Sequence, residues 1–231
     1  IDAGSGGASR PGCWPAACSC LLCVGRPPCA GHAGRCEHDP TLVTVAGLQG
    51  RRVGVGVGSS AHNVAVKALA LAGLGLKDIV PTYLAPADAT AAFNGGTIDA
   101  WVVWDPFYAI AQERYNARII ADTSDKRLAS SSYYLSSRDF ADKSPAVLSA
   151  ALDEIGKLTE WSGQHREELA KLAAAATSID ERAWRAAFAR ARFNFGEVTS
   201  AQGAQQPKLA DTVSALGTGP KKVTVSQTVC P

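Results

Sequence analysis

Apolar and polar positions follow a regular order after residue 41. Four short apolar runs have the length and the β-branched content of buried strands, and they lie at 52–57, 79–84, 99–104 and 118–121. Between these runs apolar residues recur at helical spacing, which predicts helices at 61–74, 86–93 and 107–115. A series of alternating strands and helices is typical of an open α/β sheet, and we expect one at 45–130.

The pattern changes beyond Ser130. One more strand is predicted at 133–136, and the apolar spacing then becomes helical, with helices expected at 146–161, 167–176, 180–193 and 208–216. Ser144 and Pro145 form a helix start, because a capping residue is followed by proline in the first turn. We therefore expect the α/β lobe at 41–130 to be joined to a returning strand and a helical remainder at 131–231.

Glycines cluster where the first predicted strand meets the first predicted helix, in the stretch GVGVGSSAH at 54–62. A dinucleotide fingerprint requires G-x-G-x-x-G, but Ser59 stands where the third glycine belongs, and no acidic residue ends the second strand. A P-loop requires a lysine directly after its last glycine, whereas Lys67 lies well inside the helix. Nucleotide binding is therefore not expected.

The same turn offers donors to a small tetrahedral anion. The first N–H groups of a helix have no backbone acceptor, and the helix dipole adds about half a positive charge. Ser59 and Ser60 supply two hydroxyls, and Ala61 supplies a further backbone N–H. Two interpretations remain open: these serines bind an anion, or one of them only caps the helix.

His62 lies in the first turn of that helix. It either donates to the same anion or is a partly exposed histidine without a ligand role. A hydrolase triad of Ser59, His62 and Asp105 is not expected. Ser59 and His62 share one helical turn, and the chain lacks a G-x-S-x-G elbow around this serine.

The sequence Trp104-Asp105-Pro106 closes the third predicted strand, at the edge where open α/β sheets place their ligands. Trp104 can form an apolar wall, and Asp105 can accept a hydrogen bond from a ligand. Alternatively, Trp104 is a core residue and Asp105 caps the next helix. Trp101 lies three positions earlier on the strand, so it points to the opposite face, and we expect it in the core.

Residues 1–40 differ in composition from the rest of the chain, because glycine, proline, arginine and cysteine dominate there. An apolar run at 16–24 lacks the basic start and the cleavage site of a secretory signal, so no signal peptide is predicted. A zinc site lacks the paired C-x2-C spacing, although candidate ligands are present at Cys23, Cys29, His32, Cys36 and His38. We expect this segment to be disordered or read out of frame, with neither strand nor helix.

Composition excludes several further classes. The 231 residues are 46% hydrophobic, which is enough for a sizeable core in one or two domains. Charged residues make up 19% of the chain, and the formal net charge of +2 does not indicate a nucleic-acid-binding protein. No uninterrupted apolar run reaches the roughly 18 residues of a membrane span.

Three stretches of the chain are distinctive in combination: GLQGRRVGVGVGSSAHNVAVKAL, LAPADATAAFNGGTIDAWVVWDPF and YYLSSRDFADKSPAVL. Together they resemble the periplasmic aliphatic-sulfonate-binding proteins of bacterial ABC importers. The resemblance implies an α/β fold of the type II periplasmic-binding-protein class, in which two lobes close on a ligand. It implies a complete lobe 2 and an incomplete lobe 1, because residues 1–40 replace the strands and helix that open the family's first lobe. A crossover strand just before 41–48 is among the replaced elements.

By this resemblance the protein is a binding component without catalytic activity, metal or cofactor. Its implied ligand is an alkanesulfonate taken up as a sulfur source, and its implied partner is a transporter permease. A periplasmic location and a monomeric state are implied as well. The implied ligand contacts are Ser59, Ser60, Ala61, His62, Trp104 and Asp105. Alternatives are a binding protein for taurine, nitrate or a thiamine precursor, or an α/β enzyme. Since residues 1–40 offer no second wall to the cleft, we expect weak binding.

Overall fold

The computed structural model describes residues 12–14, 21–24, 42–129 and 132–198, together with positions 204, 207, 210 and 211. The chain divides into two compact units. Unit 1 comprises Ile1–Ala17, Ser131–Leu169 and Arg192–Pro231, and unit 2 comprises Cys18–Ser130 and Ala170–Ala191. The α/β lobe expected at 41–130 falls within unit 2, which also takes in an earlier strand and a later helix.

Unit 2 is built on a five-stranded sheet with the strand order β4-β3-β5-β2-β6. β3 pairs in parallel with both β4 and β5, whereas β2 is antiparallel to its neighbours β5 and β6. The bounds are β2 (Leu21–Val24), β3 (Arg52–Val55), β4 (Val80–Tyr83), β5 (Ala100–Val103) and β6 (Arg118–Asp122). The four strands predicted from the apolar runs are confirmed as β3, β4, β5 and β6.

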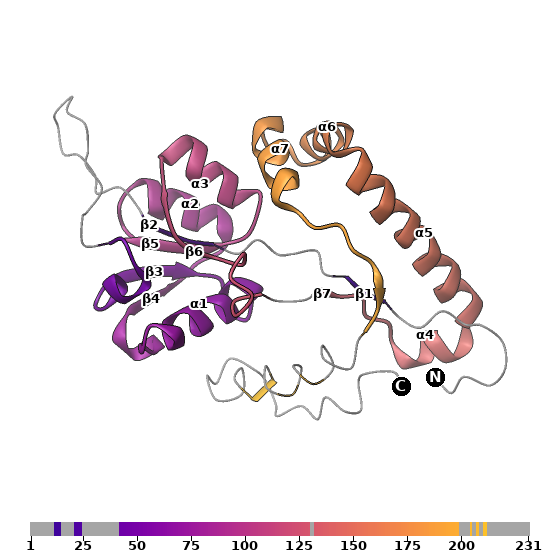
Figure 1. Cartoon of the computed structure of the whole chain (residues 1–231), viewed down its shortest axis with the longest axis horizontal. Coiled ribbons are helices and arrows are strands. Elements are labelled where there is room, and N and C mark those ends of the chain that lie inside the picture. Colours follow the sequence, from indigo (N-terminus) through magenta and orange to yellow (C-terminus); the bar gives the residue numbers. More distant parts are fainter. Residues whose placement is uncertain are drawn as a thin grey trace. The chain divides into compact units, whose positions relative to one another are not determined.

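Helices cover both faces of this sheet, with α1 on one face and α2 and α3 on the other (Figure 1). The three predicted helices are confirmed as α1 (Ser60–Leu71), α2 (Pro86–Asn94) and α3 (Phe107–Tyr115). Two short 3-10 turns, η1 (Val45–Leu48) and η2 (Leu76–Asp78), flank α1 and β3. Each face has its own core, because alternate strand residues point to opposite sides of a sheet. Val55 and Val102 pack with α1, whereas Trp101 and Val103 pack with α2 and α3.

The expectation that residues 1–40 supply no strand is wrong at two places. β2 lies between β5 and β6, and β1 (Gly12–Trp14) pairs with β7 (Ser132–Tyr133) and β8 (Gly196–Glu197) in a second sheet. β2 has the sequence LLCV, a short apolar run with a strand on each side of it in the sheet. It comes before 41–48 in the chain, and the family resemblance implies a crossover strand just before that segment. The rest of residues 1–40 and the side chains of the zinc candidates lie outside the described residues.

Unit 1 combines the three-stranded sheet β7-β1-β8 with helices that lie between β7 and β8 in the chain. The predicted strand at 133–136 is shorter than expected, because β7 ends at Tyr133. The helices are α4 (Arg138–Lys143), α5 (Pro145–Gln164) and α6 (Arg166–Thr177), of which α6 extends into unit 2, and α7 (Glu181–Arg190) belongs to unit 2. The predicted helix at 208–216 lies outside the described residues except at 210 and 211, which are helical. Across the described ranges, no helix has the length and apolar character needed to cross a membrane.

Candidate functional site

The turn from β3 to α1 is shaped by its glycines and by Ser59. Gly58 has a φ of +68°, a left-handed conformation that favours glycine over residues with a side chain. A Cβ on Gly56 would approach the Oγ of Ser59 to 3.4 Å, so the chain passes close to this hydroxyl. Ser59 itself is extended, with φ −85° and ψ 170°, as is usual for the residue that caps a helix.

The hydroxyl of Ser59 is used within the turn. It donates to the carbonyl oxygen of Gly56 at 2.6 Å and accepts from the backbone N–H of His62 at 3.2 Å. The Ser59 carbonyl accepts from the N–H of Asn63 at 3.2 Å. Ser59 therefore acts as the helix cap, one of the two roles that the sequence left open. The Ser59 hydroxyl can donate to a ligand only if its hydrogen bond to the Gly56 carbonyl is broken.

The N–H of Ala61 is the donor that this arrangement leaves at the helix start. Ala61 is the second residue of α1, where helical geometry provides no backbone acceptor, and the helix dipole favours a negative charge at this end. The whole residue, backbone included, is fully buried and belongs to the core on the α1 face of the sheet. Ser60 precedes it as the first residue of the helix. A small anion at this position would face the start of a three-turn helix.

His62 is buried beneath this turn, with 3% of its surface exposed. The N–H of Gly58 donates to its Nδ1 at 3.2 Å, so the ring proton resides on Nε2. Burial lowers the pKa of His62, which keeps the ring neutral at neutral pH. Nε2 is buried and has no hydrogen-bond partner among the described residues. The His62 ring thus fixes the loop by accepting the N–H of Gly58. A contact between His62 and a ligand remains a prediction.

Trp104 follows the last residue of β5 and packs against the core on the α1 face, where it is half-buried. Trp101 lies in the core of the opposite face and is 1% exposed, which confirms its predicted core position. β3 and β5 are parallel neighbours, so their carboxyl ends meet at one edge of the sheet. The structure therefore brings the turn at Ser59–Ala61 and the Trp104 indole to the same edge and the same face.

Asp105 is paired within the protein, and one of its contacts is to the start of the next helix, the second of the two roles that the sequence left open. Its Oδ1 accepts from Nη2 of Arg190 at 2.6 Å and from the N–H of Ala109 at 3.3 Å, and its Oδ2 accepts from Nε of Arg190 at 3.3 Å. Arg190 also lies over the ring of Tyr108, with its guanidinium carbon 3.8 Å from the ring centroid. Burial raises the pKa of Asp105, and the contacts with Arg190 oppose that rise. The carboxylate is thus committed to α7 and to the first turn of α3.

Tyr83 is a residue at this edge that sequence reasoning missed. It ends β4, next to β3, and its ring meets the ring of His62 edge-on, with centroids 5.8 Å apart. Its side chain is about half exposed. An aromatic residue near the end of a predicted strand was the available signal, but an apolar run by itself does not distinguish a site residue from a core residue.

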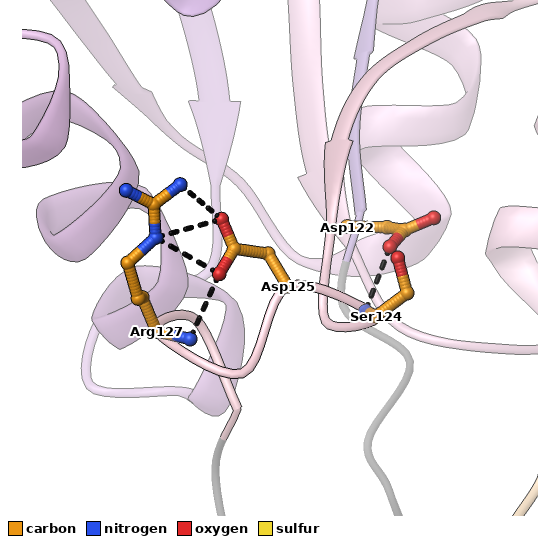
Figure 2. Close-up of polar contacts among 4 residues, drawn as sticks. All are labelled: Asp122, Ser124, Asp125 and Arg127. Carbon is orange, nitrogen blue, oxygen red and sulfur yellow. Dashed lines mark hydrogen bonds and ion pairs between the residues drawn. The ribbon is translucent and has the colours of Figure 1, made fainter.

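The turn that follows β6 is held by hydrogen bonds between its own residues. Figure 2 shows Asp122 accepting from the N–H of Ser124 at 2.7 Å, and Asp125 accepting from the backbone and guanidinium of Arg127. These hydrogen bonds lower the pKa of Asp125. Lys67 of α1 donates to the carbonyl of Ala129 at 3.1 Å, close to the end of unit 2. The described part of the chain contains no group of three or more His, Cys, Asp or Glu side chains placed to hold a metal ion.

The sheet, its helices and the edge described above place the protein in the periplasmic-binding-protein class of α/β folds. The chain belongs to the NMT1-like family, whose model matches residues 42–178. The structure of the periplasmic aliphatic sulphonate binding protein SsuA from Escherichia coli is similar, with a TM-score of 0.81 and 30% identity. That match covers 96% of this chain and 69% of the other.

Two further comparisons agree. The alkanesulfonate-binding protein SsuA from Xanthomonas axonopodis pv. citri, bound to MOPS, matches with a TM-score of 0.79 and 27% identity over 96% of this chain and 73% of that chain. An aliphatic sulfonates-binding protein of Escherichia coli (strain K12) is 40% identical over 132 residues. This match covers 57% of this chain and 41% of the relative, so the matched part spans less than half of the relative's length.

The fold alone does not separate binding from catalysis. The desulfurization enzyme DSZB shares the fold with a TM-score of 0.66, at 16% identity. The more similar relatives are named as binding proteins. The site residues of this chain therefore decide between the two.

Proposed function

We propose that this protein is the solute-binding component of an ABC importer and binds aliphatic sulfonates for uptake as a sulfur source. The proposal rests on one observation: the first residues of α1 and the Trp104 indole lie at the same edge of the sheet. A sulfonate oxygen accepts from the N–H of Ala61, and the organic group lies against the indole. The names of the related binding proteins support this ligand class.

The contact set is Ser60, Ala61 and Trp104, with Ser59 and His62 supporting the turn. Ser59 caps α1, and His62 holds the N–H of Gly58, so both act on the ligand through the backbone. Asp105 belongs to the set only through its place beside Trp104, because its carboxylate is paired with Arg190. The proposal includes a periplasmic location, a permease partner and a monomeric state.

The protein acts without turnover in this proposal. A hydrolase would need Ser59, His62 and Asp105 in one relay, but each has another partner. The Ser59 hydroxyl donates to Gly56, Nδ1 of His62 accepts from Gly58, and Asp105 accepts from Arg190. None of these side chains is positioned to take a proton from the serine. Taurine, nitrate and a thiamine precursor remain the alternative ligands of the same fold.

Titration calorimetry of the 231-residue chain tests the proposal. Ethanesulfonate is compared with taurine, nitrate and a thiamine precursor, and p-nitrophenyl acetate is used to detect ester turnover. We expect saturable binding of ethanesulfonate and no turnover above the buffer rate. Ser60→Pro should weaken binding by removing the backbone N–H and the hydroxyl of Ser60, because proline fits the first helical position without distorting it. Trp104→Ala should weaken binding by removing an apolar wall. Ethanesulfonate binding that is the same in both variants as in the parent would place the site elsewhere.

A further inference from the structure

Tyr83 lies on the same face of the sheet as α1. It is paired in parallel register with Val55 of β3, and paired residues in neighbouring strands point to the same side. Val55 is 1% exposed and packs in the α1-face core. The edge contact between Tyr83 and His62 of α1 agrees with this direction.

Trp104 lies on that face as well, two positions after Val102 and packed on the same core. The strand order β4-β3-β5 places Tyr83 and Trp104 at the carboxyl ends of the two strands that flank β3. The turn from β3 into α1 begins between them. Two aromatic side chains on one face of the sheet therefore bracket the start of the helix to which the anion is assigned.

We propose that Tyr83 is a second aromatic wall of the ligand site and selects sulfonates that carry a ring-sized apolar group. The inference rests on the proposed function for its anion site, and it extends the organic part of the ligand from aliphatic chains to ring-sized groups. Two strand spacings separate β4 from β5 by about 10 Å, which leaves width for one ring between two walls. A methyl or ethyl group would touch only one of them.

The environment of Tyr83 keeps the ring in place. His62 supports it at 63° between ring planes, and His62 is itself fixed by the N–H of Gly58. About half of the Tyr83 surface stays exposed, so a ligand can cover it without unfolding the strand. Burial of an exposed aromatic face against a ring gives both apolar burial and a ring–ring contact.

Calorimetry with benzenesulfonate and methanesulfonate distinguishes the contribution of the Tyr83 wall to affinity from that of the anion site. The variants are Tyr83→Ala, Tyr83→Leu and Tyr83→Phe, and the control is Val80→Ala. Val80 begins the same strand at the opposite edge and is 50% exposed. We expect Tyr83→Ala to lose about tenfold in benzenesulfonate affinity and less than twofold in methanesulfonate affinity. Tyr83→Phe and Val80→Ala should keep the parent values, and Tyr83→Leu should fall between.

The outcomes separate this inference from the function on which it rests. A parent chain that binds neither sulfonate contradicts both. A parent that binds both ligands, with Tyr83→Ala and Tyr83→Leu unchanged or losing equally for both, contradicts the aromatic wall and leaves sulfonate binding standing. Melting curves of all four variants check that the losses do not come from unfolding.

Discussion

Arg190 and Asp105 form a partly buried ion pair, although 85 positions separate them in the chain. Nη2 of Arg190 lies 2.6 Å from Oδ1 of Asp105, and the side chains are 29% and 14% exposed. Nη1 of the same guanidinium donates to Oε1 of Gln112 at 3.2 Å, and the guanidinium stacks on Tyr108. The last residue of α7 is thereby fixed to the end of β5 and to α3. This carboxylate at the edge of the sheet joins two parts of unit 2 that are far apart in the sequence.

Arg190→Ala is expected to lower the free energy of unfolding by about 2–3 kcal/mol. The substitution leaves the Asp105 carboxylate buried without its cation, and the chain also loses the stacking on Tyr108. Chemical denaturation followed by circular dichroism measures the change.

The matched control is Arg185→Ala on the same helix. Arg185 pairs with Glu181 at 2.7 Å in an exposed i,i+4 contact, which is worth well under about 1 kcal/mol. Equal losses in the two variants would contradict the anchoring role of Arg190.

Ser59→Ala should destabilise the protein by about 1–2 kcal/mol, because the alanine loses the cap to His62 and the hydrogen bond to Gly56. Ser59→Thr keeps a hydroxyl and should restore most of the loss. Thermal melts of the three proteins provide the measurement. Full stability in Ser59→Ala would mean that this hydroxyl does not hold the turn.

His62 should make stability depend on pH. Its pKa is lowered from 6.5 in the folded protein by burial, so below about pH 6.5 the unfolded chain binds a proton that the folded chain resists. Stability is therefore complete above this pH, and it falls as the pH drops toward the folded pKa. His62→Gln, which can still accept from Gly58, should show a smaller fall over that window in denaturation curves recorded at several pH values. An unchanged slope would show that another group is responsible.

Gly58→Ala should cost about 1–2 kcal/mol, because an alanine side chain is strained at a φ of +68°. Gly58→Asn should cost less, since asparagine tolerates the left-handed region. A Cβ at this position meets no atom within 4 Å, so crowding does not contribute. Equal unfolding midpoints for alanine and the parent would exclude strain as the reason for glycine here.

The fold of unit 2 was predictable because its local patterns agree with its tertiary arrangement. The apolar runs at β3, β4, β5 and β6 are bounded by turn residues, and the helix at Phe107–Tyr115 has the predicted bounds. β2 was missed because four apolar residues in a segment rich in proline and cysteine have no period of their own. Their strand conformation comes from two partners far along the chain. Local sequence does not contain that information.

The candidate site was predictable in its position and less so in its contacts. The GSSAH turn and Trp104 come together because they end two neighbouring parallel strands. Whether Ser59 donates to a ligand or to its own turn depends on where Gly56 places its carbonyl. The partner of Asp105 depends on the docking of α7, and the sequence gives no spacing rule for a contact of that kind.

The position of β2 has a consequence for the way the protein is made. This strand is synthesised before every other strand of its sheet, yet it pairs only with β5 and β6, the last two to emerge. Leu21–Val24 are therefore synthesised well before either of the strands with which they pair. Pairings of long sequence separation form slowly, and an unpaired apolar strand in that interval is open to association with other chains. The yield of folded protein should thus depend on how quickly translation reaches Asp122, and on chaperones that shield Leu21–Val24 until then.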